Sequence, residues 1–282
     1  MMNLFGQSCK TISFVILLAI NIYSQNSKTT IDKYLQIIPA NINAKTDEKQ
    51  EYYVTLKWQN LDALNGNKMN CNAAEATFIC GLDSGYVRWN NVSLSQINDF
   101  QQTVPKGREL PILNNFSYKA NTTDFLKESF YSIIALEDRD LAKWLFSDAV
   151  QMQGLAWYVF DSLSFNKPFM PKLLENYDVK FEHWVKFSSR YQKLIWSGIT
   201  KFNNDVCAIV KFESLYNPLE MKTTNMNFKG RSLYWGEIWI SLEDKQVEYA
   251  TMVEDVIFEL NLNNNTPKQL LDLQRDVTFT KK

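Results

Sequence analysis

A segment near the C-terminus contains the residues of this sequence best suited to chemistry. Residues 234–260 read YWGEIWISLEDKQVEYATMVEDVIFEL, a β-hairpin pattern in which acidic residues stand where strands usually carry neutral ones. On the expected pairing, Trp235 and Trp239 flank Glu237 on one face of the hairpin, and Glu254 lies on the diagonal. Glycoside hydrolysis needs two carboxyl groups about 5–9.5 Å apart. This face is therefore a candidate for carbohydrate binding or glycan cleavage.

The expected pairing depends on the position of the turn. If the chain turns at residues 244–245, Ile238 faces Thr251, and an apolar core face results. After Val253 the apolar residues move from odd to even positions. Such a change of phase needs one extra residue, so we expect a bulge or a sharp bend at residues 254–255.

No other pattern indicates a catalytic or cofactor site. The sequence contains no nucleophile-elbow, phosphate-binding, dinucleotide-binding or zinc-protease motif. The one histidine, His183, alternates with valine and phenylalanine, which is typical of a core residue in a strand. The acidic run EDRD, residues 137–140, suits the first turn of a helix better than a calcium site. We therefore expect no metal, no cofactor and no catalysis, with the pair Glu237 and Glu254 as the alternative.

The composition is that of an ordinary globular protein. The 282 residues are 45% hydrophobic, 14% aromatic and 22% charged, which allows a large core. The formal net charge is −1, and no basic stripe is present that could displace phosphate counterions. Nucleic acid is therefore not an expected partner.

The N-terminus has the pattern of a secretory signal peptide. Lys10 precedes a largely apolar run over residues 12–20, and polar residues follow. This run is too short for a bilayer, which needs about 20 residues, so we do not expect an integral membrane protein. Cleavage after residue 24 would leave one exported domain, residues 25–282, in the periplasm or outside the cell. A buried first helix is the alternative.

Three cysteines would remain after such a cleavage. Cys71 and Cys80 could close a short loop by a disulfide bond, which would stabilise the fold by about 2–3 kcal/mol. Two free thiols are the alternative. Cys207 lies in the strand-like run DVCAIVKF and is expected to be a buried free thiol.

A helical period occupies the middle of the chain, about residues 122–163. Trp144, Trp157 and Phe160 widen its apolar stripe almost all round, so we expect a largely buried helix. Asp148 falls inside this stripe. It is either a buried carboxylate with a raised pKa or, as we favour, the cap of a second helix after a break just before it.

Strand patterns fill most of the remaining chain. We expect a hairpin that turns at residues 83–85, two strands around residues 203–205, and strands to the C-terminus from residue 177. The last of them, LLDLQRDVTFTKK, is expected at a sheet edge because it ends in lysines. These patterns predict an α+β fold with one large, curved, half-barrel-like antiparallel sheet and a helical layer from the middle of the chain.

Two segments resemble a known family. WSGITKFNNDVCAIVKF and LYWGEIWISLEDKQVEYATMVED are similar to the LolA/LolB-like lipoprotein carriers, in paired strands around a G…cy.l step and in an iWid strand before a turn. The resemblance covers about 65 residues. The whole chain also looks like uncharacterised exported proteins of Bacteroidota. The family resemblance implies a curved half-barrel closed by helices around an apolar cavity for acyl chains.

The resemblance also implies a function. The protein would be a non-catalytic carrier or binding protein for an apolar ligand, such as a lipid or the acyl chains of a lipoprotein. The buried helix would plug the concave side of the sheet, and its aromatic residues would line the cavity. The expected ligand-binding residues are Trp144, Trp157, Phe160, Trp235 and Trp239. No pattern predicts an oligomeric state.

Overall fold

The computed structural model describes residues 31–82, 85–120, 124, 127–172, 177–181, 185–222, 226–262 and 267–282. The expected signal peptide and His183 lie outside these residues. Backbone contacts divide the chain into two compact units, Met1–Ile38 and Pro39–Lys282. The described part of the first unit begins with a short helical segment at residues 31–35. The second unit contains one large sheet and the helix that lies on it.

The sheet is antiparallel and open. Its long strands are β1 (Gln50–Asp62), β2 (Lys68–Leu82), β3 (Tyr86–Gln96), β9 (Lys193–Phe202), β10 (Asp205–Lys222), β11 (Met226–Ser241), β12 (Val247–Leu262) and β13 (Gln269–Lys281). The shorter ones are β4 (Arg108–Glu109), β5 (Ser117–Lys119), β6 (Pro168–Phe169), β7 (Tyr177–Phe181) and β8 (Val185–Ser189). The described strands follow the order β4-β3-β2-β1-β13-β12-β11-β10-β8-β7, while β5 pairs with β3, and β9 pairs with β10 and β6. The predicted α+β fold with a large antiparallel sheet is confirmed.

The two hairpins predicted from turn residues are present. β2 and β3 pair up to Leu82 and Tyr86, on either side of the expected turn. β9 and β10 are joined at Asn203 and Asn204, whose φ angles are 47° and 75°. Asparagine tolerates this left-handed conformation, which tight hairpin turns require.

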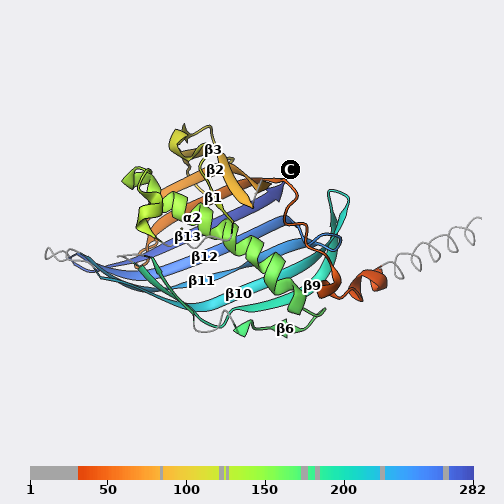
Figure 1. Cartoon of the computed structure of the whole chain (residues 1–282). Helices are drawn as coiled ribbons and strands as arrows, with labels where there is room; N and C mark the ends of the chain where they lie inside the picture. Colours follow the sequence, from red (N-terminus) through yellow and green to blue (C-terminus); the bar gives the residue numbers. More distant parts are fainter. Residues whose placement is uncertain are drawn as a thin grey trace, which may run out of the picture. The chain divides into compact units, whose positions relative to one another are not determined.

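The last strand is an interior strand, so its predicted place at a sheet edge was wrong. β13 pairs with β12 on one side and with β1 on the other, and Figure 1 shows these strands side by side. The lysines at its end form ion pairs, Lys281 with Glu248 and Lys282 with Glu51. The sequence pattern could not show this, because the second partner comes from the other end of the chain.

One long helix covers one face of the sheet (Figure 1). It comprises α2 (Leu136–Gly154), a π-helical turn, η5 (Leu155–Val159), and a 3-10 turn, η6 (Phe160–Ser162). The predicted helix in the middle of the chain is confirmed, but its start at residue 122 was too early. Before α2, the described residues from 124 onward contain the 3-10 turn Glu128–Tyr131.

The first turn of α2 contains the acids expected there. Glu137 and Asp138 lie at the positive end of the helix dipole, and Asp138 also pairs with Arg108 at 2.8 Å. α2 continues unbroken past residue 147, so Asp148 does not cap a second helix. The favoured interpretation of Asp148 was therefore wrong.

Alternate residues of the strands form two unlike faces, which we call the helix face and the open face. The helix face meets α2, and its side chains are at most 2% exposed: Tyr52, Val54, Leu56, Ile238, Ile240, Ala250, Met252, Val277 and Phe279. The open face carries the residues between them, which remain partly exposed: Tyr53, Thr55, Glu237, Trp239, Tyr249, Thr251, Thr278 and Thr280. Over β1 this face is covered by the loop after β3, where Lys57 donates to the carbonyls of Phe100 and Gln102.

The hairpin of β11 and β12 is paired one residue away from the predicted register. Ile238 pairs with Ala250, and Thr251 pairs with Glu237. The loop comprises residues 242–245 and begins two residues earlier than expected, since the amide of Ser241 donates to the carbonyl of Gln246 at 2.9 Å. This loop moves the pairing by two residues, and an extra residue in β12 moves it back by one. A shift of one residue moves all side chains of one strand to the opposite face.

The bulge of this hairpin is also not at the predicted place. The register shifts between Trp239, which pairs with Tyr249, and Ile240, which pairs with Val247. Glu248 is thus the extra residue of the bulge. Pairing through residues 254–255 is regular, so the bulge expected there is absent.

Cys71 and Cys80 cannot form a disulfide bond with each other. Both belong to β2, and nine residues of extended strand span about 30 Å, whereas bridged cysteines have Cα atoms within about 7 Å. Their odd separation also directs them to opposite faces. Both cysteines, and Cys207 with them, are buried free thiols.

Candidate functional site

The centre of the interface between α2 and the helix face is ionic. The Arg275 guanidinium donates to Glu254 Oε2 at 2.6 Å and to both Asp148 carboxylate oxygens at 3.2 and 3.3 Å. Ser232 Oγ donates to Glu254 Oε1 at 2.5 Å. The side chains of Arg275, Asp148 and Glu254 are only 7%, 5% and 12% exposed. These four residues, which we call the ion cluster, connect α2 to β11, β12 and β13.

Two tryptophans enclose the ion cluster. Trp144 lies one turn before Asp148 on α2, and its ring centre is 5.1 Å from the guanidinium carbon of Arg275, within range of a cation–π interaction. Trp58 of β1 meets Trp144 edge-on at 5.5 Å. Trp144, an expected ligand-binding residue, therefore forms a wall of the ion cluster.

Burial raises the pKa of the Asp148 carboxyl to about 6, while the charge of Arg275 opposes this rise and that of Glu254 adds to it. Burial also disfavours the charge on Arg275, but the two carboxylates outweigh this effect and raise the pKa of the guanidinium. Two carboxylates thus share one cation, and Asp148 takes up a proton in mildly acidic solution. The interpretation of Asp148 as a buried carboxylate with a raised pKa is confirmed.

The long helix, α2 together with η5, also contains unsatisfied polar groups. Trp157 Nε1 and Gln153 Nε2 are buried without a hydrogen-bond partner. Gln153 lies against the thiol of Cys80, which is only a weak acceptor. Buried charges and unpaired polar groups hold an interface less firmly than a well-packed apolar surface does. The interface between α2 and the sheet is therefore partly polar.

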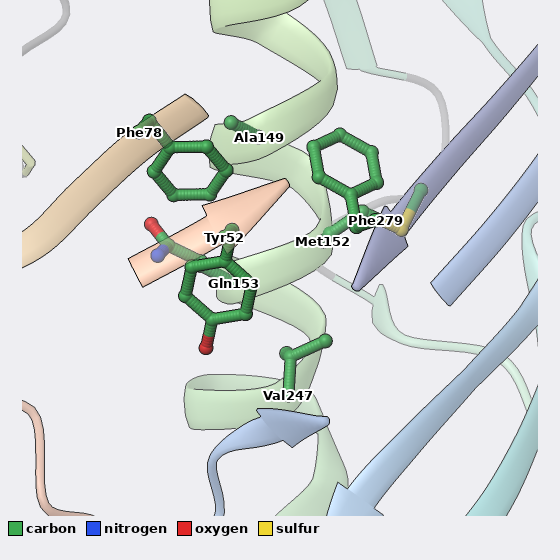
Figure 2. A pocket seen from close by; sticks show the side chains of 7 residues that line it. All are labelled: Tyr52, Phe78, Ala149, Met152, Gln153, Val247 and Phe279. Carbon is green, nitrogen blue, oxygen red and sulfur yellow. The ribbon is translucent and has the colours of Figure 1, made fainter. Parts of the chain in front are cut away.

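A small cavity lies between α2 and the sheet, one turn beyond Asp148. Figure 2 shows its lining, with Ala149, Met152 and Gln153 from α2 facing side chains of the strands, namely Tyr52, Phe78, Val247 and Phe279. Its volume is about 10 Å³, the space of about one water molecule. Pockets for organic ligands measure about 300–1,000 Å³. Here the side chains of α2 fill the space that the family resemblance assigns to acyl chains.

A second ion pair holds the C-terminal end of the long helix. Lys245, in the loop between β11 and β12, is 3% exposed and pairs with Asp161 of η6. Its φ angle of 59° places it in the left-handed region. The helix is thus fixed by charges at its middle and at its end.

The other two aromatic residues expected to bind ligand on the helix pack into the protein. Phe160 is fully buried and meets the ring of Trp196 on β9 at 5.9 Å. Trp157 is half-buried in the π-helical turn. Together with Trp144, they form part of the contact that the helix makes with its surroundings.

The tryptophans of β11 lie on the open face, away from α2. Trp239 contacts Tyr249 and Phe202, with ring centres 4.7 and 5.5 Å away, and its Nε1 donates to Glu237 Oε1 at 2.9 Å. Trp235 is 39% exposed. The five expected ligand-binding residues are therefore divided between two separate regions.

Glu237 and Glu254 lie on opposite faces of the sheet. Glu237 pairs with Thr251 on the open face, whereas Glu254 pairs with Tyr234 and Arg275 and belongs to the ion cluster under α2. The sheet separates the two carboxylates, so they cannot act on one glycosidic bond. The prediction of a glycan-cleaving pair was wrong because it depended on the predicted pairing of β11 and β12, which differs by one residue from the observed pairing.

Arg275 and Lys245 were not predicted as functional residues. The first could have been recognised, since Leu271, Leu273, Val277 and Phe279 alternate around it, and an arginine in such a row is a candidate buried cation. Lys245 gave no such signal, because charged residues are common in turns. Its burial depends on η6, which is distant in sequence.

The comparisons with family models and with curated sequences identify no relative. The sequence matches no model of a known protein family, and it has no significant match among curated proteins. Within the described ranges, no helix is long and apolar enough to cross a membrane. The same part of the chain brings no three histidine, cysteine, aspartate or glutamate side chains together as a metal site.

Proposed function

We propose that this chain is an exported, non-catalytic carrier that binds an apolar ligand, such as the acyl chains of a lipid or lipoprotein, between α2 and the helix face. The observation that carries the proposal is the partly polar contact between α2 and the helix face. The long helix covers the apolar face of an open sheet, yet its central attachment is the ion cluster. The resemblance to lipoprotein carriers supports the same reading.

In this proposal the ligand takes the place of α2. The side chains that α2 now covers, such as Met252, Val277 and Phe279, would contact an acyl chain with little rearrangement. Lifting α2 would expose Arg275 and its carboxylates to water, and their hydration offsets part of the free energy lost in the apolar contact. A ligand can shift this equilibrium only if it binds the open state more tightly.

A covalent staple between α2 and β2 would test the need for this movement. The Gln153 side chain reaches the Cys80 thiol, so Gln153→Cys places a shorter thiol on α2 facing Cys80. A thiol-reactive crosslinker that contains a reducible disulfide joins the two cysteines, and Gln153→Ser is the matched control. The stapled protein should lose binding of a fluorescent fatty acid, and reduction should restore it. The control should bind as the wild type does under both conditions, and a thiol count of the denatured protein reports staple formation.

Two results would contradict the proposal. One is equal binding of the probe by the crosslinked and reduced Gln153→Cys variant once the staple has formed. The other is a native protein that contains no lipid in mass spectrometry and binds no acyl probe.

Export is tested separately by the mass of the mature N-terminus, which should begin near residue 25.

A further inference from the structure

Large apolar side chains are exposed on the open face where β10 bulges. Leu215 and Tyr216, each 51% exposed, lie between the pairs that Ser214 and Asn217 make with β11, so both oppose Leu233. Trp235 follows two residues after Leu233 on the same face of β11 and is 39% exposed. Tyr191 is 67% exposed. We call Tyr191, Leu215, Tyr216, Leu233 and Trp235 the bulge patch.

Tyr191 joins this patch through the register of the sheet edge. β8 and β9 pair with β10 on either side of the bulge in one continuous register, Phe187 with Leu219 and Lys193 with Glu213. Counted on from Lys193, this register brings Tyr191 level with Leu215, although residues 190–192 form no strand of their own. Its φ angle of 56° is strained for a bulky residue.

A buried polar network fixes the backbone beneath the bulge patch. Asn217 is fully buried and donates to the carbonyls of Ser214 and Ser232 at 3.0 and 3.1 Å. It accepts from the amide of Arg190 at 3.1 Å, and Ser214 Oγ lies 2.9 Å from the Arg190 carbonyl. The network satisfies the backbone on both sides of the bulge. The exposed side chains thus stand on a backbone whose polar groups have hydrogen-bond partners.

The half of the sheet that carries the bulge patch is positively charged. Residues 185–241 contain eight Lys and Arg against four Asp and Glu, a net charge of +4, although the whole chain has −1. Lys211 and Arg231 are exposed on the open face beside the patch, and Lys193 pairs with Glu213 at 2.7 Å. Residues 242–282 have a net charge of −3 and residues 1–184 one of −2. One acid among residues 242–282, Asp255 of β12, pairs with Leu233.

We propose that the bulge patch docks this protein on the surface of an anionic lipid bilayer. Tyrosine and tryptophan prefer the membrane–water interface, because their rings are apolar and their tips are polar. Leu215 enters the acyl boundary, and the surrounding cations meet anionic headgroups. A neutral glycan could stack on the aromatic rings, but it has no negative charge to pair with the net charge of +4 that residues 185–241 carry. The proposal is independent of the acyl-chain site under α2.

Vesicle co-sedimentation tests this docking. The wild-type protein should bind vesicles of phosphatidylcholine with about 30% phosphatidylglycerol, should bind pure phosphatidylcholine much less, and should dissociate as salt rises. Leu215→Ser/Tyr216→Ser should weaken binding about tenfold, as should Lys211→Glu/Arg231→Glu. The matched control is Tyr158→Ser, which removes a ring that is 75% exposed on the helix and should leave binding unchanged. Circular dichroism verifies that each variant is folded.

Three results would overturn the docking proposal. They are absence of binding to anionic vesicles at low salt, equal weakening by Tyr158→Ser, and binding of a soluble polysaccharide in place of vesicles. The Gln153→Cys staple separates the two proposals. The stapled protein should still bind vesicles although it no longer takes up the fatty-acid probe.

Discussion

The two faces of the sheet are built from the same strands, but the side chains of one face are buried and those of the other are partly exposed. On β12 and β13, Met252 and Val277 are at most 2% exposed under α2, while their neighbours Thr251 and Thr278 remain partly exposed. The helix face encloses charges that need all of their partners, whereas the open face presents rings and hydroxyls to solvent. Substitutions of the same type should therefore have very different effects on the two faces.

The largest difference is expected for arginine. Arg275→Met leaves Asp148 and Glu254 buried without their cation, which should lower the free energy of unfolding by about 3–5 kcal/mol. Arg231→Met on the open face, the matched control, should change it by at most about 0.5 kcal/mol. Urea unfolding at neutral pH measures both. Similar losses for the two variants would show that the buried carboxylates of Asp148 and Glu254 do not depend on Arg275.

A smaller loss of unfolding free energy is expected when a methyl group is added to the packed helix face. In Gly236→Ala the added Cβ would lie 2.0 Å from the Thr251 carbonyl oxygen and 2.8 Å from the Phe212 ring. Strands must move apart to accept it, so we expect a loss of about 2–3 kcal/mol. Gly154→Ala, with open space around its Cβ, should instead stabilise α2 by up to about 1 kcal/mol. Thermal unfolding distinguishes the two, and a stable Gly236→Ala variant would contradict the tight packing.

The smallest of the three effects depends on pH. The pKa of Asp148 is about 6 in the folded protein and about 3.9 when unfolded, so the folded state binds the proton more tightly. The stabilising contribution of this proton is present below about pH 3.9 and is lost as pH rises through about 6.

Asp148→Asn resembles the protonated carboxyl and lacks this titration. Relative to the wild type, it should gain about 1–3 kcal/mol of stability between pH 4 and pH 7. Urea unfolding at several pH values measures the difference. A difference that does not vary with pH would contradict the raised pKa.

Local patterns predicted much of the fold. The helical period that includes Trp144 and Phe160 gave the long helix, and the Asn203-Asn204 turn gave the β9–β10 hairpin, because both depend on neighbours in sequence. The candidate site was predicted less well. A bulge of one residue at Glu248 was enough to place Glu237 and Glu254 on opposite faces, and hydrophobic alternation cannot locate such a bulge.

The sequence by itself determined the types of the elements and their order, since periods of 3.6 and 2 residues and turn chemistry are local properties. Only the tertiary structure decided which strands became partners and what each face encloses. β1 pairs with β13 across almost the whole chain, and the same contact makes β13 an interior strand. Asp148 and Arg275 are 127 residues apart and meet only when α2 lies on the sheet. The ion cluster therefore exists only in the folded protein, where burial makes a charge without its partner costly.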